Sequence, residues 1–378
     1  MRLVQARLPD QRRHPRDAHR RGDNRRLKIL LVRLREIGDV VFTTPAVRAI
    51  RRRFPWARIT YVVEPAASAI VEHSPHIDEL IVAPRPSGIG RLRSELALIR
   101  RLRAAEYDIA IDFHSGPRAS ILTWLSGAPV RVGYTVVGRS WMYTRRIARP
   151  RELRPRHSVE NQWDLLAALN IGPPDRIEYP VEMPLGDRTV SALSERLSRA
   201  GVHGDHRLIV MHVSAGNPFR RWPVESFAAV AAGLAGRDPM RRVVITSGPS
   251  DRQAADRVIV EAQALLGHDR GRVLECGEFS LPELRALVDR AALYIGGDSG
   301  PMHIAATSHV PIVSLYGPTL PARSAPWRAT LWPAESVEVA GLACRPCDQR
   351  SCVPGDFRCL AWIQPPQVIE AAERALTG

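Results

Sequence analysis

The residues of this sequence whose types and spacing could do chemistry lie in three short loops. The clearest loop falls within residues 294–307, YIGGDSGPMHIAAT. Its apolar start predicts a buried strand, its glycines a tight turn, and Pro301 the first turn of a helix with Asp298 or Ser299 as its cap. A turn of this kind directs free backbone N–H groups and the positive end of a helix dipole into one crevice. The segment therefore predicts an anion-binding site.

Two other interpretations apply to the same residues. The letters GDSG at 297–300 also occur around the nucleophile of chymotrypsin-like proteases, which are all-β proteins. This chain alternates predicted strands and helices throughout, which disfavours a protease. The turn could also be a well-capped connection without a ligand. The two other loops argue against that alternative, because they would bring further polar groups to similar positions.

The second loop follows the first predicted strand, residues 28–34 (KILLVRL). It is followed by residues 40–53, whose apolar positions recur at helical spacing with arginines on the opposite face. Asp39 is therefore expected between the C-terminal end of a strand and the N-terminal end of a helix, where open α/β sheets bind their ligands. Its carboxylate could cap the helix or act as a general base, and the two roles are compatible.

The third loop, HSGPR at 114–118, follows a predicted strand over 107–113 and opens another helix. Because the carboxyl ends of parallel strands share one edge of a sheet, this loop is expected beside Asp39. Ser115 and Arg118 are then candidates to contact an anionic substrate. The alternative is that both residues only begin a capped helix.

Strand and helix patterns alternate along both halves of the chain, which implies parallel, doubly wound sheets. The sequence predicts an α/β fold of two similar domains with a cleft between them. Neither a G-x-G-x-x-G fingerprint nor a G-x-x-x-x-G-K-[ST] loop follows a predicted strand, which disfavours a dinucleotide oxidoreductase or a P-loop ATPase. Further strands are expected over 58–63, 79–83, 130–134, 208–213, 243–247, 274–277, 292–295 and 311–316, and further helices over 66–73, 92–104, 158–170, 224–234, 252–266, 281–289 and 364–376.

The length of 378 residues and the 45% of hydrophobic residues suit two domains with substantial cores. A proline-rich, aperiodic stretch over 172–186 predicts the link between them. The expected division is an N-terminal domain over 28–178, a C-terminal domain over 179–360, and a final helix over 361–378 that could pack back on the N-terminal domain.

The net charge of +15 is carried almost entirely by arginine, since Lys28 is the only lysine. Residues 1–27 hold nine arginines against three aspartates without hydrophobic periodicity, which predicts a disordered tail or an over-extended start of the reading frame. Scattered arginines and no recognisable module disfavour nucleic acid as a partner. A weak attraction to an anionic membrane face or a phosphorylated substrate remains compatible. No apolar stretch suits a membrane span or a signal peptide, so a cytoplasmic location is expected.

Four cysteines cluster near the C-terminus with the spacing C-x2-C-x4-C-x6-C, while Cys276 lies apart. Such a cluster in a cytoplasmic protein suggests zinc more readily than disulfides. The spacing of the second pair is unlike that of a usual zinc ribbon, so reduced, locally packed thiols are the alternative. The candidate ligands of a structural zinc ion are Cys344, Cys347, Cys352 and Cys359.

With these loops in place, the chain from Lys28 to its end resembles the bacterial heptosyltransferases, a family of glycosyltransferases that transfer heptose from ADP-heptose to the inner core of lipopolysaccharide. Three motifs carry the resemblance: REIGDVVFTTPAVRAI at 35–50, the segment 214–223 that ends in RRWP, and GDSGPMHIAA at 297–306. The resemblance implies GT-B architecture, with two Rossmann-like domains facing a central cleft. It implies that the domain over 28–178 binds the acceptor and that the domain over 179–360 binds the nucleotide sugar. It also implies inversion at the anomeric carbon with no cofactor and no required metal.

The resemblance assigns roles by position. Asp39 matches the catalytic base, and Arg220 matches a donor-binding lysine, although arginine presents a planar fork where lysine presents a point charge. Ser299 stands where several members have threonine and keeps the hydroxyl. The donor-binding residues implied in this way are Ser214, Gly216, Asn217, Arg220, Asp251, Asp298, Ser299, Gly300 and His303, and the acceptor-binding ones are Gly38, Ser115 and Arg118.

The implied partners are a nucleotide-sugar donor and a lipopolysaccharide-type glycolipid acceptor, with peripheral contact with the inner membrane compatible. Motifs of this kind identify the site that binds the diphosphate more reliably than the pocket that selects the sugar. A same-fold transferase with another nucleotide sugar or acceptor is therefore the nearest alternative. A non-catalytic binding relative is less compatible with an intact Asp39.

Overall fold

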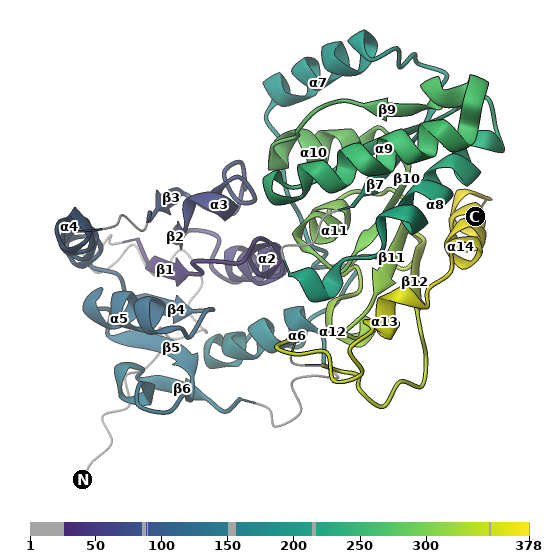
Figure 1. Cartoon of the computed structure of the whole chain (residues 1–378). Helices are drawn as coiled ribbons and strands as arrows, with labels where there is room; N and C mark the ends of the chain where they lie inside the picture. Colours follow the sequence, from purple (N-terminus) through teal and green to yellow (C-terminus); the bar gives the residue numbers. More distant parts are fainter. Residues whose placement is uncertain are drawn as a thin grey trace.

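The computed structural model describes residues 26–84, 88, 90–149, 156–213, 217–347 and 349–377. It contains two six-stranded sheets, each with parallel strand pairs throughout. Figure 1 shows them as two lobes, the N-terminal one on the left and the C-terminal one on the right. The predicted tail over 1–27 falls almost wholly outside the described residues.

The first sheet has the strand order β3-β2-β1-β4-β5-β6. Its central strand is fully buried from Ile29 to Val32, as expected for a parallel strand covered by helices on both faces. The strands are β1 (Lys28–Val32), β2 (Arg58–Val63), β3 (Glu79–Val82), β4 (Ile109–Asp112), β5 (Val130–Tyr134) and β6 (Arg145–Ile147). The helices of this half are α1 (Ile37–Val41), α2 (Thr44–Arg53), α3 (Pro65–Ser68), α4 (Gly90–Ala104), α5 (Pro117–Leu125), η2 (Ser140–Met142), α6 (Ser158–Trp163) and η3 (Asp164–Leu169).

The second sheet has the order β12-β11-β10-β7-β8-β9. Its strands are β7 (Arg207–His212), β8 (Arg241–Thr246), β9 (Val273–Glu275), β10 (Ala291–Gly297), β11 (Ile312–Tyr316) and β12 (Ala334–Glu338). The longer helices are α7 (Asp187–Arg199), α8 (Val224–Gly236), α9 (Arg252–Leu266), α10 (Leu281–Asp289) and α14 (Pro365–Thr377), and the shorter ones are η4 (Pro218–Arg220), η5 (Pro249–Asp251), η6 (Gly267–Arg272), α11 (Gly300–Ala305), α12 (Pro321–Ser324) and α13 (Arg358–Ala361).

Both sheets share one topology. Counted within its own domain, each sheet has the order 3-2-1-4-5-6, in which the direction of winding reverses between the first and fourth strands. Ligands of such sheets bind at the carboxyl ends of the strands beside this reversal. The relevant loops follow β1 and β4 in the first sheet and β7 and β10 in the second. These are the loops that the sequence predicted to carry chemistry.

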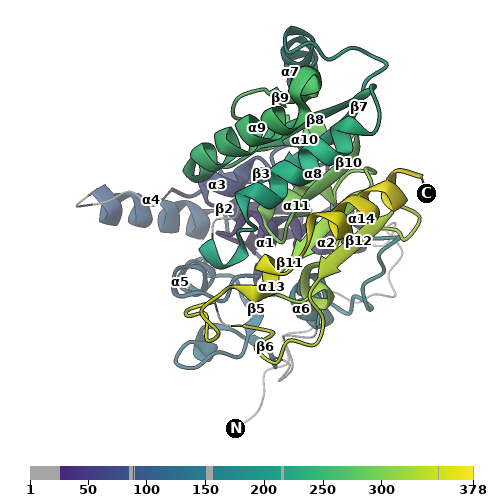
Figure 2. The ribbon, with the colours of Figure 1, turned by 45° about the vertical axis from the view of Figure 1, so that its right-hand side comes forward.

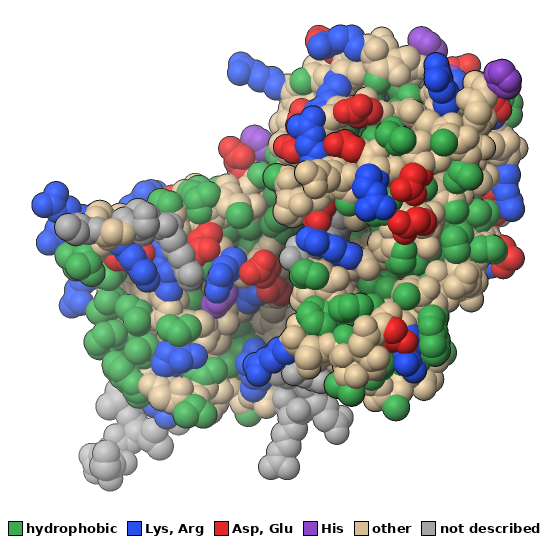
Figure 3. Space-filling model, in the orientation of Figure 1, with side chains coloured by type: hydrophobic (Ala, Val, Ile, Leu, Met, Phe, Trp, Pro, Cys, Tyr) green, Lys and Arg blue, Asp and Glu red, His purple; other side chains and the backbone are tan. Residues whose placement is uncertain are grey.

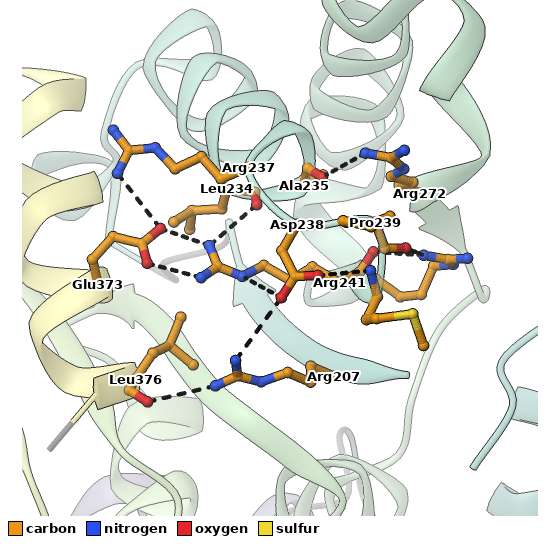
Figure 4. A network of polar contacts seen from close by, with 12 residues as sticks. Arg207, Leu234, Ala235, Arg237, Asp238, Pro239, Arg241, Arg272, Glu373 and Leu376 are labelled. Atoms are coloured by element: carbon orange, nitrogen blue, oxygen red, sulfur yellow. Dashed lines mark hydrogen bonds and ion pairs between the residues drawn. The ribbon is translucent and has the colours of Figure 1, made fainter. Parts of the chain in front are cut away.

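The final helix packs on the C-terminal domain, which corrects the expectation that it could return to the N-terminal one. α14 contacts α8 and strands β10, β11 and β12, and Figures 1 and 2 both show it beside α8. Val368, Ala371 and Ala372 are fully buried against this domain. The guanidinium of Arg241 at the start of β8 donates to both carboxylate oxygens of Glu373, at 2.6 and 2.8 Å (Figure 4).

Several elements differ from the sequence predictions. The helix expected over 40–53 is two helices, α1 and α2, and the one expected over 158–170 continues after Trp163 as the 3₁₀ segment η3. The elements that were not predicted include α7, β6, β12 and several short helices, among them α12 and α13. β12 follows the strand that the sequence indicated as the last.

Candidate functional site

Asp39 lies within α1, beside the carboxyl end of β1. The N-cap of α1 is Glu36, so the interpretation of Asp39 as the helix cap is wrong. Its side chain is 37% exposed and forms an ion pair with Arg33, a buried residue that follows β1. Arg33 also donates to the backbone oxygen of Phe113, at 2.7 Å. Asp39 is therefore a solvent-accessible carboxylate whose position is fixed by a cation tied to the loops after β1 and β4.

His303, a residue of the second domain, lies against Gly38, the residue before Asp39. The helices α1 and α11 pack together, and a Cβ added at Gly38 would lie 2.4 Å from Cδ2 of the His303 ring. The ring also packs on Phe42, with 4.4 Å between the ring centroids. Burial lowers the pKa of His303, against the opposite effects of Asp298 and Asp39, so the imidazole is neutral at pH 7.

Gly38 and Gly300 permit the close approach of the two domains. A Cβ at Gly300 would lie 2.9 Å from Cγ2 of Ile37, and Gly38 itself is buried under His303. In this conformation Gly38 faces the C-terminal domain. Its expected contact with an acceptor stays a prediction.

Asp298 is the buried anchor of the turn after β10. Its Oδ2 accepts a hydrogen bond of 2.5 Å from the Thr319 hydroxyl, and its Oδ1 lies 3.5 Å from Nε2 of His303. Arg220 approaches from η4, where Nη1 donates to the backbone oxygen of Asp298 at 3.0 Å and lies 3.5 Å from its Oδ2. The cation thus sits directly over the turn that was predicted to bind an anion.

Gln349 joins two predicted donor-binding residues. Its Oε1 accepts from Nε of Arg220 at 2.8 Å and from Nδ2 of Asn217 at 3.0 Å. Asn217 in addition caps η4, accepting from the backbone N–H of Phe219 at 3.0 Å. The remaining donor-loop predictions, Ser214 and Gly216, lie outside the described residues.

Two other predicted donor residues lie at the same edge of the second sheet. Ser299 is the N-cap of α11, and its buried hydroxyl has no hydrogen-bond partner in the described part of the chain. Asp251, beyond β8, lies 2.8 Å from Nη2 of Arg221 and accepts a hydrogen bond of 3.0 Å from the Ser250 hydroxyl. These carboxylate contacts hold Asp251 in place and are compatible with its expected contact with a ribose.

The two acceptor candidates after β4 have structural partners. Ser115 has a positive φ of 55°, and its backbone N–H donates to Asp112 at 2.7 Å. The Arg118 guanidinium lies between Glu64 and Glu95, at 2.9 and 2.6 Å. Arg118 thereby ties α5 to α4 and to the end of β2, which favours the helix-start alternative for this residue.

The four clustered cysteines of the predicted zinc site lie in and before α13. Among the described residues, no group of three or more His, Cys, Asp or Glu side chains could hold a metal ion. All four cysteines are free thiols; Cys359 is carried by α13, which packs on β11, whereas the other three lie in the loop before it. The thiols of Cys344, Cys347 and Cys352 all act electrostatically on that of Cys359, and the zinc ion at these cysteines stays a prediction.

Sequence reasoning missed three residues that shape the site: Arg33, Thr319 and Gln349. Arg33 carried a signal, since it is a charge within an otherwise apolar strand pattern. The contact of Thr319 with Asp298 spans 21 residues of sequence, and that of Gln349 with Arg220 spans 129. No local sequence pattern predicts either contact. Among the described helices, none has the length and apolar character needed to cross a membrane.

The comparisons with known proteins agree with this geometry. A family model described as glycosyltransferase family 9 (heptosyltransferase) matches residues 95–355. Lipopolysaccharide heptosyltransferase 3 of Escherichia coli is 28% identical over 286 residues, covering 75% of this chain and 81% of the relative. The crystal structure of a family 9 glycosyl transferase from Veillonella parvula superposes with a TM-score of 0.77 at 27% identity, covering 93% of this chain and 97% of that one.

A further solved structure, ADP-heptose lps heptosyltransferase II of Escherichia coli, has a TM-score of 0.73 at 20% identity and covers 93% of this chain and 99% of that one, a likeness of fold. Two doubly wound domains that meet at their switch-point loops give this protein GT-B architecture, and the matched family model makes it a glycosyltransferase. The chain belongs to glycosyltransferase family 9, the heptosyltransferase family.

Proposed function

We propose that this enzyme transfers heptose from ADP-heptose to the inner core of lipopolysaccharide, with inversion at the anomeric carbon and without a required metal. Family membership and the names of the relatives support this donor and acceptor. The observation that carries the proposal is the contact of α1 with α11. The accessible carboxylate of Asp39 and that of Asp298 both act electrostatically on His303, which supports a base close to an anion-binding turn.

In this reaction Asp39 accepts the proton of the acceptor hydroxyl as its oxygen attacks the anomeric carbon. The bond to the diphosphate breaks on the opposite face, and negative charge grows on the leaving ADP. Arg220 and the backbone N–H groups after Asp298 are placed to stabilise that charge. Arg33 holds the carboxylate of Asp39 toward the cleft.

Arg220 has to change partners when the donor binds. In the described structure its guanidinium donates to an amide oxygen of Gln349 and a backbone oxygen of Asp298. A diphosphate offers charged acceptors, which form stronger hydrogen bonds than these neutral ones. We expect the phosphates to displace Gln349 from Arg220 while Thr319 keeps Asp298 in place.

The proposal also places the enzyme in the cytoplasm, at the inner face of the inner membrane. ADP-heptose is a charged nucleotide sugar that does not cross an apolar bilayer unaided. Its acceptor is a glycolipid anchored in that bilayer. A peripheral enzyme would meet both substrates there.

The test of the catalytic role is Asp39→Asn, which keeps the size of the side chain and removes its basicity. We expect transfer to fall by a factor of about 100 or more, while ADP affinity changes by less than about twofold. Asp256→Asn, at an exposed position of α9, is the matched control and should leave both unchanged. An Asp39→Asn enzyme with tenths of the wild-type rate would remove Asp39 as the base.

The donor is tested by thermal unfolding with ADP, UDP, GDP and ADP-heptose, each without added metal. A ligand at a hundred times its dissociation constant adds about 2.7 kcal/mol of stability, which gives a measurable shift. Stabilisation by ADP and ADP-heptose alone is the expected result. Stabilisation by UDP or GDP would instead support the alternative, a same-fold transferase with another nucleotide sugar.

A further inference from the structure

Large apolar side chains are exposed on one face of the N-terminal domain. They lie on α4, on α5 and in the loop after β5, and Val137 at the tip of that loop is 98% exposed. In α4 only Leu102 is buried, although the helix has fifteen residues. The exposed residues, which we call the α4–α5 face, are Leu92, Leu96, Ile121, Trp124, Val137 and Trp141.

These side chains belong to one surface. Trp124 of α5 and Trp141 of η2 are in edge-to-face contact, with ring centroids 5.0 Å apart. α4 packs along α5, and the ion pair between Arg118 and Glu95 joins the two helices at 2.6 Å. Figure 3 shows hydrophobic side chains gathered over the α5 region, with Lys and Arg side chains at their margin over α4, and Figure 2 shows α4 projecting from the body of the protein.

The α4–α5 face is also strongly basic. The sequence of α4 contains five arginines and one glutamate, a net charge of +4. Arg101 pairs with Glu79, whereas no ion pair joins Arg91, Arg93 or Arg100 to another described residue. A surface that combines exposed tryptophan and leucine with unneutralised arginine matches the interface of an anionic bilayer, where aromatic rings lie at the head groups and arginines meet lipid phosphates.

The position of this face relates it to the catalytic edge. α4 begins after β3 and α5 after β4, so the N-terminal ends of both helices lie at the carboxyl edge of the first sheet. Leu92 and Leu96 occupy the first half of α4, and Val137 follows β5 at the same edge. Asp39 follows β1 there. A bilayer on the α4–α5 face would therefore present its head groups at the edge that carries the base.

We propose that the α4–α5 face docks this enzyme on the surface of an anionic lipid bilayer. The biological purpose of such docking rests on the proposed function, since it would bring a membrane-anchored acceptor to Asp39. The binding itself requires neither substrate. A second copy of the chain fits the face less well, because two surfaces of like charge repel each other.

The experiment is co-sedimentation of the full chain with vesicles of phosphatidylcholine alone or mixed with phosphatidylglycerol. We expect the wild type to sediment with the mixed vesicles only. Arg93→Gln/Arg100→Gln should weaken this binding by about thirtyfold, because each arginine near an anionic surface contributes about a factor of five. Leu92→Ser/Trp141→Ser should weaken it to a similar extent through the loss of apolar burial.

Matched controls come from the other domain. Arg188→Gln/Arg199→Gln on α7 removes two exposed arginines, and Val260→Ser/Leu265→Ser on α9 removes two exposed apolar side chains. Neither control should change vesicle binding, and all four double variants should keep the wild-type unfolding temperature because every substituted side chain is exposed.

Three results would overturn the proposal. One is equal sedimentation of the wild type with neutral and anionic vesicles, or with neither. Another is retention of binding by both α4–α5 variants, which would assign it to other arginines, including those of residues 1–27. The third is a concentration-dependent dimer that the Leu92→Ser/Trp141→Ser variant abolishes. A chain that binds anionic vesicles through this face but transfers no heptose would refute the proposed function and leave the docking surface standing.

Discussion

Among single residues, Arg220 is the one on which we expect donor binding to depend most. It lies at the Asp298 turn, where its two hydrogen bonds go to neutral oxygens that a diphosphate can replace, while the Asp298 carboxylate lies 3.5 Å away. We expect Arg220→Ala to weaken ADP binding by about 10- to 100-fold, the effect of losing charge-assisted hydrogen bonds. Calorimetric titration with ADP measures this directly. Arg257→Ala, at an exposed position of α9, should bind ADP as the wild type does; an Arg220→Ala protein with unchanged affinity would exclude the residue from the donor site.

Two buried histidines make the stability of the fold depend on pH. Burial lowers the pKa of His157 and of His212 to about 4, and Nδ1 of His212 lies 2.9 Å from the Thr246 hydroxyl. In the unfolded chain a histidine titrates near pH 6.5. Their neutral forms therefore favour the folded state fully above about pH 6.5, and this stability is lost as the pH falls from about 6.5 to 4, by about 3 kcal/mol for each residue.

Urea unfolding at pH 7, 5.5 and 4.5 tests this prediction. His212→Gln should lower the free energy of unfolding at pH 7 but make it fall less steeply with acid than in the wild type, because one group that binds a proton only on unfolding is gone. His268→Gln, at an exposed position, is the control and should leave the slope unchanged. If the free energy of unfolding of His212→Gln falls with acid as steeply as that of the wild type, the pKa of His212 is the same in the folded and unfolded states.

The residues that sequence reasoning found and missed differ in one physical respect. Asp39 and Asp298 stand in segments whose own pattern of strand, glycine and helix start indicates the ligand-binding edge of a sheet. Arg33, Thr319 and Gln349 act through contacts with residues that only the folded chain brings near. Arg118 was predicted in the right loop, but its two carboxylate partners come from other elements, which its local sequence does not indicate.

At the scale of elements, the attachment of α14 depends on one buried ion pair. Arg241 is 8% exposed and is bound by both oxygens of Glu373 (Figure 4). Glu373→Ala would leave this buried guanidinium with only the carboxylate of Asp238, 3.7 Å away, so we expect a loss of about 2 kcal/mol in the free energy of unfolding. The same helix provides a control, the bidentate pair of Arg374 and Glu335, in which Arg374 is 61% exposed.

Glu335→Ala should cost less than about 1 kcal/mol, since solvent screens an exposed pair. Denaturant unfolding of both variants gives the comparison. If the Glu335 and Glu373 variants lose equal stability, burial does not distinguish the two pairs and the proposed anchor is wrong.

The elements that could not be predicted are those with weak local patterns. The strand β6 has only three residues, and β12 (AESVE) combines two glutamates with small or apolar residues at the edge of its sheet. Such edge strands form because they pair with a neighbouring strand, and the intrinsic β-propensity of their residues contributes less. The break between α1 and α2 falls just before Pro45, the second residue of α2, where a proline begins a helix more readily than it continues one.

At the scale of the whole molecule, the alternation of strands and helices was enough to predict two doubly wound domains. The same alternation predicted neither the order of strands in each sheet nor the contacts between the two domains. That meeting depends on packing between α1 and α11, where Gly38 lies under His303 and Gly300 under Ile37. Asp39 reaches the donor turn only because these two glycines allow the helices to approach.

Gly38→Ala tests whether this approach is needed for catalysis. The new Cβ would lie 2.4 Å from a ring that is buried and packed on Phe42, so the ring cannot simply rotate away and the helices must separate. A displacement of about 1 Å between base and donor costs roughly 100-fold in rate. ADP should still bind with nearly wild-type affinity, because Arg220 and Asp298 both belong to the C-terminal domain.

The control is Gly172→Ala, at a position with open space around the new Cβ. It should leave both the transfer rate and the affinity for ADP unchanged. A Gly38→Ala enzyme with the wild-type transfer rate would mean that catalysis takes place with the two helices farther apart than they are here.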